Sequence, residues 1–330
     1  MTRNKILVSH SDLDGIGAIF IGWYYREKLG FDDFLSEDYG FEQDKDKMDL
    51  LKSYRTVVFA DLSIPEEYHN QLIEAGVDVS YYDHHSSAEY LQGYDKMTFD
   101  LDKCGTMLFW EFYVKPRIKR FPPIVEEFVT LVDTYDIWRQ ESELWQTAKN
   151  LNSVLYGIRD YGSKNFFESY EPFFNLMTTK FKHFTHWKET DLERRLIERA
   201  EKREQDVYDK ARETMSIRLD SKGKAFGVFA VPSKISLVAS RILLEEPELD
   251  YLVIVNTWGG ITGRLSFRSK NGFNCNSLGA ANGHDCAAGG EILPDLAKEF
   301  LEDPSLAFTY EEDFDPENPR SVIEKVELEE

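Results

Sequence analysis

Imidazole and carboxylate groups gather in a short run near the start of the chain, His10-Ser11-Asp12-Leu13-Asp14-Gly15. Groups of the same kind recur at Asp61 and in Asp83-His84-His85. Residues i, i+2 and i+4 of an extended chain project to one side, so His10, Asp12 and Asp14 are expected to converge on one point. Imidazole with carboxylate suits Mn²⁺, Mg²⁺ or Fe²⁺, whereas softer sites use Cys. The pattern predicts a site for two metal ions and, with it, two-metal hydrolysis of a phosphoester.

Apolar runs with the character of buried strands position these groups. The runs 5–9, 56–60 and 78–82 each stop directly before a histidine or an aspartate. Between and after them lie helix-like segments at 16–29, 66–75 and 106–113. Such alternation predicts βαβ units and a parallel sheet, and open α/β sheets bind ligands at the carboxyl edge.

Two further features bear on the site. Gly15 stands where the chain turns from strand into helix, and its small size is expected to let backbone N–H groups approach an anion or a metal-bound water. Pro122-Pro123 precedes an apolar helix at 124–136 that carries Asp133 and Asp136. Three residues apart on a helix, these two carboxylates occupy neighbouring surface positions.

Taken in order, the run 9–15, Asp61, the Asp83-His84-His85 triplet and the acidic end of the helix at 124–136 resemble the DHH phosphoesterase superfamily. Any one of these pieces alone is weak evidence. Here four occur in order, and three of them end predicted strands. The resemblance spans the N-terminal domain and implies a parallel-sheet α/β catalytic domain with two Mn²⁺ per chain, or Mg²⁺ as the alternative.

The same resemblance implies a set of metal ligands. His10 and Asp12 would hold one ion, and Asp14 and His84 the other. Asp61 would bridge both, because one carboxylate can offer an oxygen to each ion. Asp136 is the preferred further ligand, and Asp133 is the alternative to it.

The resemblance also implies the catalytic residues, Asp83 and His85. Asp83 would orient an imidazole by accepting its second N–H, as carboxylates commonly do beside a metal-bound histidine. His85 would face the substrate phosphate or the leaving group, where it could donate a hydrogen bond or a proton. The alternative is that Asp83 and His85 form a purely supporting hydrogen-bonded pair.

A second, smaller α/β domain is predicted after a long charged helix. Residues 188–215 hold nine acidic and eight basic side chains with apolar residues at helical spacing, which is typical of a salt-bridge-laced helix. Beyond it, residues 263–269 and 282–290 are similar to the substrate-binding domain that accompanies many DHH catalytic domains. That resemblance implies substrate contacts from Arg264, Arg268, Ser269, Gly283 and His284. The alternative is that these are surface arginines on an ordinary strand and glycines used for packing.

One position departs from the family pattern: Asn282 stands where the pattern favours glycine. Asn is the non-glycine residue most tolerant of positive φ, so the turn can survive the change. The predicted organisation is a DHH catalytic domain at 1–185, a linker helix at 186–215, a substrate-binding domain at 216–302 and an acidic tail at 303–330.

Charge limits the class of partner. The 330 residues carry a formal charge of −21. The last thirty residues contribute −9 of it, from eleven acidic and two basic side chains. A protein that tracks long nucleic acid normally offers a basic groove, so this composition disfavours long nucleic-acid tracking. A small basic pocket, or metal ions among the carboxylates, could still receive one or a few phosphates.

Composition also bounds the compartment. The three cysteines, Cys104, Cys275 and Cys286, are odd in number and lack CxxC spacing, so we expect packing roles in place of disulfides or structural zinc. No stretch reaches the roughly 20 apolar residues of a membrane span, and the N-terminus runs into a strand where a signal peptide would have its apolar core. We expect a cytoplasmic protein with no membrane association, and the oligomeric state stays open.

The function expected from these residues is a metal-dependent phosphodiesterase. Among the branches of the superfamily, the Arg268 and His284 signature resembles the nanoRNase and pAp-phosphatase branch, which implies hydrolysis of short oligonucleotides to mononucleotides in a cleft between the domains. A nucleoside 3′,5′-bisphosphate phosphatase activity is a companion expectation. The alternatives are a cyclic-dinucleotide phosphodiesterase, a single-strand-specific exonuclease and, from another class, a non-catalytic nucleotide-binding protein.

Overall fold

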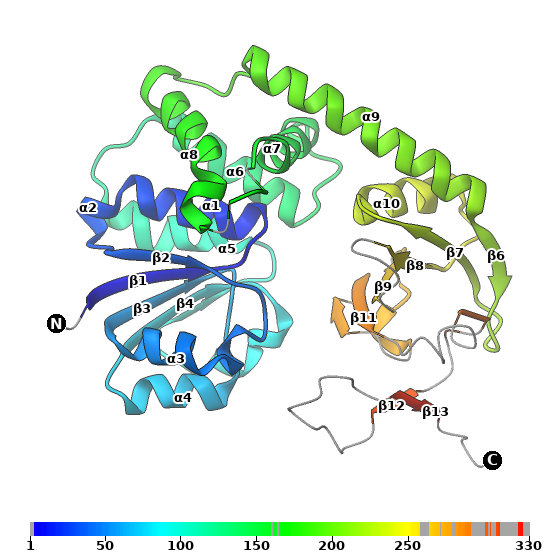
Figure 1. Ribbon diagram of the computed structural model, residues 1–330, viewed down its shortest axis with the longest axis horizontal. Helices are drawn as coiled ribbons and strands as arrows, with labels where there is room; N and C mark the ends of the chain where they lie inside the picture. The colour runs from blue at the N-terminus through cyan, green and yellow to red at the C-terminus, as the bar shows by residue number, and fades with distance from the viewer. Residues whose placement is uncertain are drawn as a thin grey trace. The chain divides into compact units, whose positions relative to one another are not determined.

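The computed structural model describes residues 3–159, 161–163, 165–257, 264–270, 272–278, 282–284, 286–291, 301, 302, 304, 308–310 and 323–325. The chain divides into two compact units, Met1–Glu198 and Arg199–Glu330, whose elements are labelled in Figure 1. Each unit contains a β-sheet of its own.

A five-stranded sheet forms the centre of the first unit. Its order is β2-β1-β3-β4-β5, and every neighbouring pair is parallel. The strands are β1 (Arg3–Ser9), β2 (Asp33–Ser36), β3 (Tyr54–Ala60), β4 (Asp78–Asp83) and β5 (Met97–Phe99). Because all five are parallel, their carboxyl ends share one edge. The predicted α/β fold with a parallel sheet is confirmed.

Helices cover both faces of this sheet, which explains why its central strands are apolar at almost every position. Leu7 and Val58 lie in the core on one face, whereas Ile6, Val8 and Val57 lie in the core on the other. Figure 1 shows α3 (Lys45–Lys52) and α4 (Glu66–Glu74) on the second face. The first face is covered by α1 (Leu13–Tyr24), α5 (Gly105–Leu108), α6 (Pro123–Asp136), α7 (Trp145–Ile158) and α8 (Phe166–His183).

The predicted elements of this unit need three corrections. The prediction of one helix at 16–29 is wrong in two respects. Helix α1 begins earlier, at Leu13, and the segment ends in a separate short helix, α2 (Arg26–Leu29). The predicted helix at 106–113 is α5 followed by a π-helical turn, Phe109–Val114. The short elements β2, α3 and β5 were not predicted, because a few residues give no readable periodicity.

The second unit has a six-stranded sheet in the order β10-β11-β9-β8-β7-β6, in which β7 and β8 form the parallel pair and the other described pairs are antiparallel. Helix α10 (Ile235–Glu245) packs on one face through Val238 and Ile242. The strands are β6 (Ser216–Leu219), β7 (Ala225–Val231), β8 (Tyr251–Asn256), β9 (Arg264–Ser269), β10 (Asn282–His284) and β11 (Ala287–Glu291). In the predicted acidic tail, β12 (Phe308–Tyr310) pairs with β13 (Ile323–Lys325), and most other tail positions lie outside the described residues.

Two of the three cysteines pack as predicted. All three are free thiols, and Cys104 and Cys275 are buried in hydrophobic cores. Cys286 is exposed, so the packing role predicted for it is wrong.

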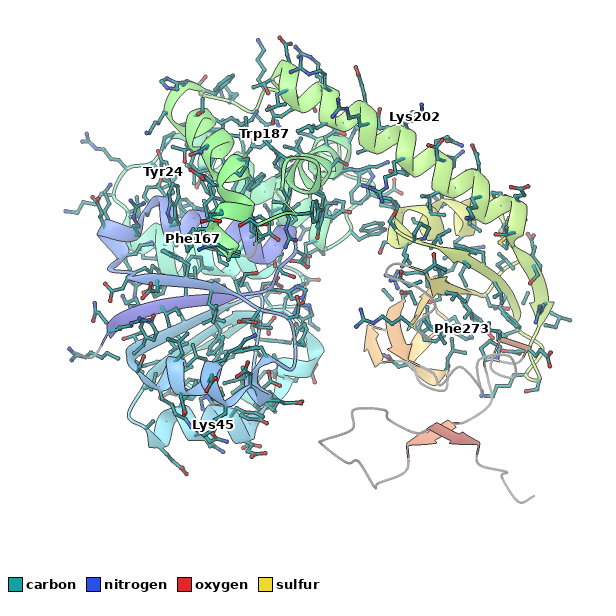
Figure 2. The ribbon with its side chains drawn as sticks, in the orientation of Figure 1. Tyr24, Lys45, Phe167, Trp187, Lys202 and Phe273 are labelled. Atoms are coloured by element: carbon teal, nitrogen blue, oxygen red, sulfur yellow. The ribbon has the colours of Figure 1, made fainter. Side chains whose placement is uncertain are left out.

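Helix α9 (Asp191–Thr214) has its two ends in different cores. Leu196 and Ile197 pack with Val154, in the first unit, whereas Val207 and Ala211 belong to a core of the second unit. Its exposed middle carries charged side chains, among them Lys202, which Figure 2 labels. Neither α9 nor any other helix within the described ranges is long and apolar enough to cross a membrane.

A buried ion pair fixes the start of α9 to the first unit. Lys180 of α8 and Glu193 of α9 have side chains that are 0% and 1% exposed, and Lys180 Nζ lies 2.9 Å from Glu193 Oε2. The same ammonium donates to the Lys188 carbonyl and lies 4.5 Å from the centre of the Trp187 ring, a residue labelled in Figure 2. Glu193 also accepts from Thr190 N at 2.7 Å, which satisfies a donor at the helix N-terminus.

Lys180→Met is expected to destabilise the first unit by about 3–5 kcal/mol, because it leaves the Glu193 carboxylate buried without its counter-charge. Five of the six tryptophans lie in residues 1–198, so urea unfolding followed by tryptophan fluorescence reports on this unit. The control is Lys182→Met, which removes an exposed ammonium from the same helix and should change stability little. Equal effects of the two variants would contradict the structural role of the pair.

Candidate metal centre

The turn between β1 and α1 carries His10, Asp12 and Asp14, and its geometry differs from the prediction. Asp12 is the N-cap of α1, and its carboxylate accepts a hydrogen bond from Gly15 N at 3.1 Å. Asp14 already lies in the first helical turn. The prediction that all three project from one extended segment is therefore wrong, and a strand-to-helix turn places them instead.

A close contact within the turn between β1 and α1 requires glycine at position 15. A Cβ atom at position 15 would lie 2.1 Å from the His10 carbonyl oxygen, so only glycine lets α1 start this close to the end of β1. The Gly15 N–H is directed at the Asp12 carboxylate. This amide is therefore engaged within the turn, and the approach of other backbone N–H groups to an anion or a metal-bound water stays a prediction.

Asp61 follows β3 in a left-handed backbone conformation, with φ of 54°. Aspartate is one of the few non-glycine residues enriched in this region. Its side chain is 1% exposed, and its Oδ2 atom accepts no hydrogen bond from any residue that the structure describes. A buried carboxylate oxygen without a donor is costly, so this atom is suited to a cation.

Asp83, His84 and His85 end β4 at the same edge. Asp83 Oδ1 accepts from His84 N at 2.8 Å and lies 2.8 Å from His85 Nδ1, while Ser63 Oγ donates to Asp83 Oδ2 at 2.5 Å. Asp83 thus holds the His85 ring by Nδ1, which leaves Nε2 as the outward nitrogen. His84 Nε2 lies 3.4 Å from Asp61 Oδ1, and His85 Nδ1 lies 3.8 Å from the same oxygen.

The structure gathers the predicted ligands into overlapping groups. In one group His10, Asp12 and Asp61 place ligand atoms within 4.8 Å of one another, and in another Asp14, His84 and Asp136 do so. A further group, made of Asp61, Asp83, His84 and His85, shares Asp61 with the first and His84 with the second. His84 Nε2 lies 3.9 Å from Asp14 Oδ2 and 3.2 Å from Asp136 Oδ2. Asp61 belongs to the first group and approaches the second through His84. The orphaned Asp61 oxygen and this hard donor set fit divalent ions such as Mn²⁺ or Mg²⁺.

The two carboxylates of α6 have different surroundings. Asp133 Oδ1 accepts from Cys104 N at 2.9 Å, and the other oxygen forms an ion pair with Arg139. Asp136 has no such cation among the described residues, and its Oδ2 atom is buried beside His84. Asp136 therefore lies among the candidate ligands, while Asp133 supports the loop at Cys104.

The N-terminus of α5 is a contributor that the sequence analysis missed. Gly105 N and Thr106 N donate to the two Asp14 carboxylate oxygens at 2.6 and 2.7 Å. A Cβ atom at position 105 would lie 2.5 Å from the Asp61 backbone, so this loop packs directly against the end of β3. The signal was a Gly-Thr pair opening an apolar helix, which is common at helix N-termini.

Residues after β2 were also missed. Ser11 Oγ donates to Asp38 Oδ1 at 2.6 Å, and that oxygen lies 3.5 Å from His10 Nε2. The Tyr39 ring lies 5.5 Å from the His10 ring and 5.7 Å from the His85 ring, centre to centre. Recognising β2 as a fourth strand ending at this edge would have pointed to them.

The buried carboxylates differ in electrostatics. Burial, together with repulsion from Asp14 and Asp12, raises the pKa of Asp61 and that of Asp136 well above the usual range. Burial opposes ionisation of Asp12 as well, yet its hydrogen bond with His10 holds its pKa below the usual value. The His85 ring does the same for the pKa of Asp83. Without a cation the centre holds excess negative charge, which protons or metal ions can relieve.

In the second unit, Arg268 is held by its own domain. Its guanidinium donates to Phe267 O at 2.7 Å, to Ala288 O at 3.3 Å and to Ser236 Oγ at 3.0 Å, and burial lowers its pKa. Arg264 lies on the same strand and is exposed, whereas Ser269 Oγ donates to Phe273 O at 2.7 Å.

The remaining predicted contacts lie on β10. Gly283 and His284 pair with Ala288 and Ala287 of β11. The side chain of His284 lies outside the described part of the chain. The structure therefore places the His284 backbone in register with Arg268 across the intervening strand β11 and does not describe its imidazole.

No family model matches the chain. Oligoribonuclease NrnB of Bacillus subtilis (strain 168) is 25% identical over 271 residues, which cover 76% of this chain and 63% of that relative's length.

Two solved structures share the fold. The DHH domain of a protein described as a member of a family of ribosomal proteins superposes with a TM-score of 0.63 at 15% identity, over 91% of this chain and 85% of that chain. RecJ of Thermus thermophilus, solved in complex with Mn²⁺, has a TM-score of 0.54 at 18% identity, over 91% of this chain and 51% of that chain. The predicted resemblance to DHH proteins is confirmed at the level of the fold.

Mn²⁺ is expected to raise the melting temperature of chelator-treated protein, and the rise should grow between about pH 5 and about pH 8. With their pKa raised in the folded state, Asp61 and Asp136 bind protons more tightly there than in the unfolded chain. The free energy of unfolding of the metal-free protein therefore falls as the pH rises through the raised pKa values of Asp61 and Asp136. At higher pH fewer protons compete with the metal ion for these carboxylates.

The measurement is the difference in melting temperature with and without Mn²⁺ at each pH. Asp136→Asn should flatten the pH dependence, and Asp95→Asn, which changes an exposed carboxylate, should retain it. A metal-induced rise that shrinks toward higher pH would contradict the prediction.

Proposed function

We propose, from the DHH-type fold of this chain, that it is a divalent-metal-dependent phosphodiesterase that hydrolyses short oligonucleotides to mononucleotides. The observation that carries the proposal is the pair of ligand groups at the carboxyl edge of the parallel sheet, with Asp61 a member of one and close to the other. Two-metal centres are suited to phosphoester hydrolysis.

Each residue has a role in this proposal. His10, Asp12 and Asp61 would hold one ion, while Asp14, His84 and Asp136, with Asp61, would hold the other. Bound there, two divalent cations would activate a water molecule and stabilise the charge that develops on phosphorus-bound oxygens. The Gly105 and Thr106 amides fix Asp14, so this ligand needs no reorganisation when a cation enters.

His85 is the proposed proton donor to the leaving oxygen. Asp83 holds Nδ1 of His85. Burial lowers the pKa of His85, but the hydrogen bond with Asp83 and its charge raise it, and the net effect is a raised pKa that favours the protonated ring. Ser63 and two backbone amides fix Asp83 in turn. The hydrogen-bonded chain thus aims Nε2 of His85 while keeping Asp83 ionised.

Three observations support a short nucleotide substrate. The sequence relative is itself an oligoribonuclease. The chain is acidic, which suits few phosphate contacts. The second unit presents Arg268 beside Ser236 in the first turn of α10. Just before that helix, Ser233 Oγ is a buried hydroxyl that no described residue engages. We propose that this region receives the substrate end remote from the cleaved bond. Mn²⁺ is the proposed ion because the donor set suits it and the fold relative RecJ was solved with it.

Asp61→Asn is expected to lower the hydrolysis rate by more than about a hundredfold and to weaken Mn²⁺ binding in parallel, since losing a direct ligand should cost more than losing a supporting partner. Asparagine tolerates the left-handed backbone, so the fold should persist. Calorimetric Mn²⁺ titration and hydrolysis assays check this, with Asp95→Asn as the matched control. A variant that binds two ions and keeps a tenth of the rate would refute the bridging role.

Product analysis of di-, tri- and ten-nucleotide RNA and DNA with Mn²⁺ is expected to show fastest cleavage of the shortest chains. Cyclic di-AMP and a nucleoside 3′,5′-bisphosphate belong in the same series. Faster cleavage of the cyclic dinucleotide, preference for the ten-mer with steep salt dependence, or binding without turnover would each overturn the proposed substrate class.

Arg268→Ala is expected to raise KM for a dinucleotide by roughly tenfold while leaving hydrolysis of a small generic phosphodiester nearly unchanged, because a charge-assisted contact contributes to binding remote from the reaction. Arg218→Ala, an exposed arginine of β6, serves as the control. Equal losses on both substrates would mean that the second unit does not select the substrate.

A further inference from the structure

A basic hollow lies at the end of the first unit opposite the metal centre. Helix α1 starts at the centre, is twelve residues or about 18 Å long, and ends with Trp23 and Tyr24 beside the hollow. Helix α6 runs the other way, from Pro122 at the hollow to Asp136 at the centre. Figure 1 shows α2 at the end of the sheet where β1 begins, and Figure 2 labels Tyr24 there. The hollow is therefore distinct from the site already described.

Positive charge is concentrated here in an acidic protein. The hollow, about 510 Å³, is lined by Arg26, Lys28, Arg120 and Lys182, with Glu27 as its acidic residue. All four cations are exposed, and within the described ranges no carboxylate forms an ion pair with any of them. The chain has a formal net charge of −21, yet these four cations have no local counter-charge, so they are suited to binding an external anion.

Two hydroxyl groups of the lining residues have no partner within the described part of the chain. Tyr25 is 7% exposed, and neither its phenolic oxygen nor the Thr178 Oγ1 atom forms a hydrogen bond with a described residue. Burial raises the pKa of Tyr25, so its hydroxyl stays protonated and available as a donor. Buried polar groups almost always have a hydrogen-bond partner, so the Tyr25 and Thr178 hydroxyls indicate a missing partner with acceptor oxygens.

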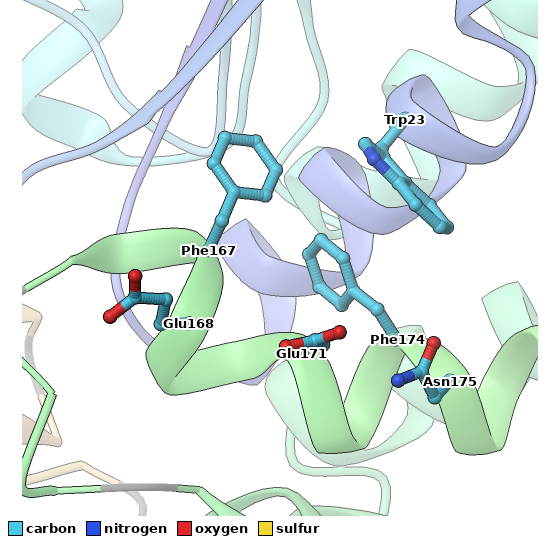
Figure 3. A pocket seen from close by; sticks show the side chains of 6 residues that line it. All are labelled: Trp23, Phe167, Glu168, Glu171, Phe174 and Asn175. Carbon is cyan, nitrogen blue, oxygen red and sulfur yellow. The ribbon is translucent and has the colours of Figure 1, made fainter.

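An aromatic slot adjoins the basic hollow. Trp23 lines both, and with Phe167 and Phe174 it forms a second hollow of about 230 Å³ (Figure 3). The Trp23 and Phe174 ring centres lie 5.3 Å apart, and Glu168, Glu171 and Asn175 of α8 also line this hollow. Arg26, which lines the basic hollow, is held against Trp23, since it donates to Trp23 O at 3.0 Å and lies over the indole ring. An apolar slot with polar groups at its rim suits a planar heterocycle.

We propose that these adjoining hollows form a second nucleotide-binding site, which takes a nucleoside monophosphate. The phosphomonoester lies among Arg26, Lys28, Arg120 and Lys182 and accepts from the Tyr25 and Thr178 hydroxyls. The base lies against Trp23 in the aromatic slot. The site needs no metal ion and is separate from the proposed hydrolytic centre, so it stands or falls independently of the proposed activity.

The test is calorimetric titration of the full-length protein with adenosine 5′-monophosphate, both with Mn²⁺ and with EDTA. Binding in EDTA is expected, and Arg26→Gln/Lys182→Gln should weaken it by about tenfold or more because both charges are lost. Lys202→Gln/Lys210→Gln makes the same charge change on exposed positions of α9 and should leave binding unchanged. Binding that vanishes in EDTA, or that responds equally to the two double variants, overturns the proposal.

Tyr25→Phe separates recognition from folding. It removes only a hydroxyl that no described residue engages, so thermal stability should hold or rise while affinity falls about two- to tenfold. Unchanged affinity would overturn the role of the buried hydroxyls.

Ligand fragments test the two halves of the site. Inorganic phosphate, ribose 5-phosphate and adenosine should each bind more weakly than adenosine 5′-monophosphate. Ribose 5-phosphate binding as tightly would overturn the base contact with Trp23, and adenosine binding as tightly would overturn the phosphate contact. Hydrolysis of a small phosphodiester with Mn²⁺ should be unaffected by Arg26→Gln/Lys182→Gln, since neither residue lies at the metal centre.

Discussion

Repulsion among buried carboxylates is the constraint around which the first unit is built. Asp14 and Asp61 are almost fully buried, and both Asp14 and Asp12 disfavour ionisation of Asp136. No fold assembles such a cluster for stability alone, because each ionised group costs desolvation as well as mutual repulsion. The remaining structure must hold these groups together until a cation relieves the repulsion.

Backbone geometry does most of that holding. Parallel pairing of β1, β3 and β4 fixes where their carboxyl ends lie, and the cores on both faces of the sheet fix the strands. The α5 amides orient Asp14, and the contacts of Asp83 orient His85. Rigid supports of this kind let charged groups be placed before any ligand binds.

Sequence alone predicts the part of this arrangement that depends on chain order. Three apolar strands that each end at a histidine or aspartate must meet at one edge of a parallel sheet, so the association of His10, Asp61 and His84 was predictable. The choice between Asp133 and Asp136 was not, because it depends on Arg139 and Cys104 from other elements. The role of α5 was not predictable either, since contacts across ninety residues leave no local pattern.

The glycines at positions 15 and 105 have a consequence for ion selection. A Cβ atom at position 15 would clash with the His10 backbone, and one at position 105 would clash with the Asp61 backbone. The turn after β1 and the packing of the α5 loop on the end of β3 are therefore both tight. A cage of this kind cannot expand to suit a larger ionic radius. Mg²⁺ and Mn²⁺, with short bonds to oxygen, should be accepted, whereas Ca²⁺, which prefers about 2.3–2.6 Å and more ligands, should be excluded by size.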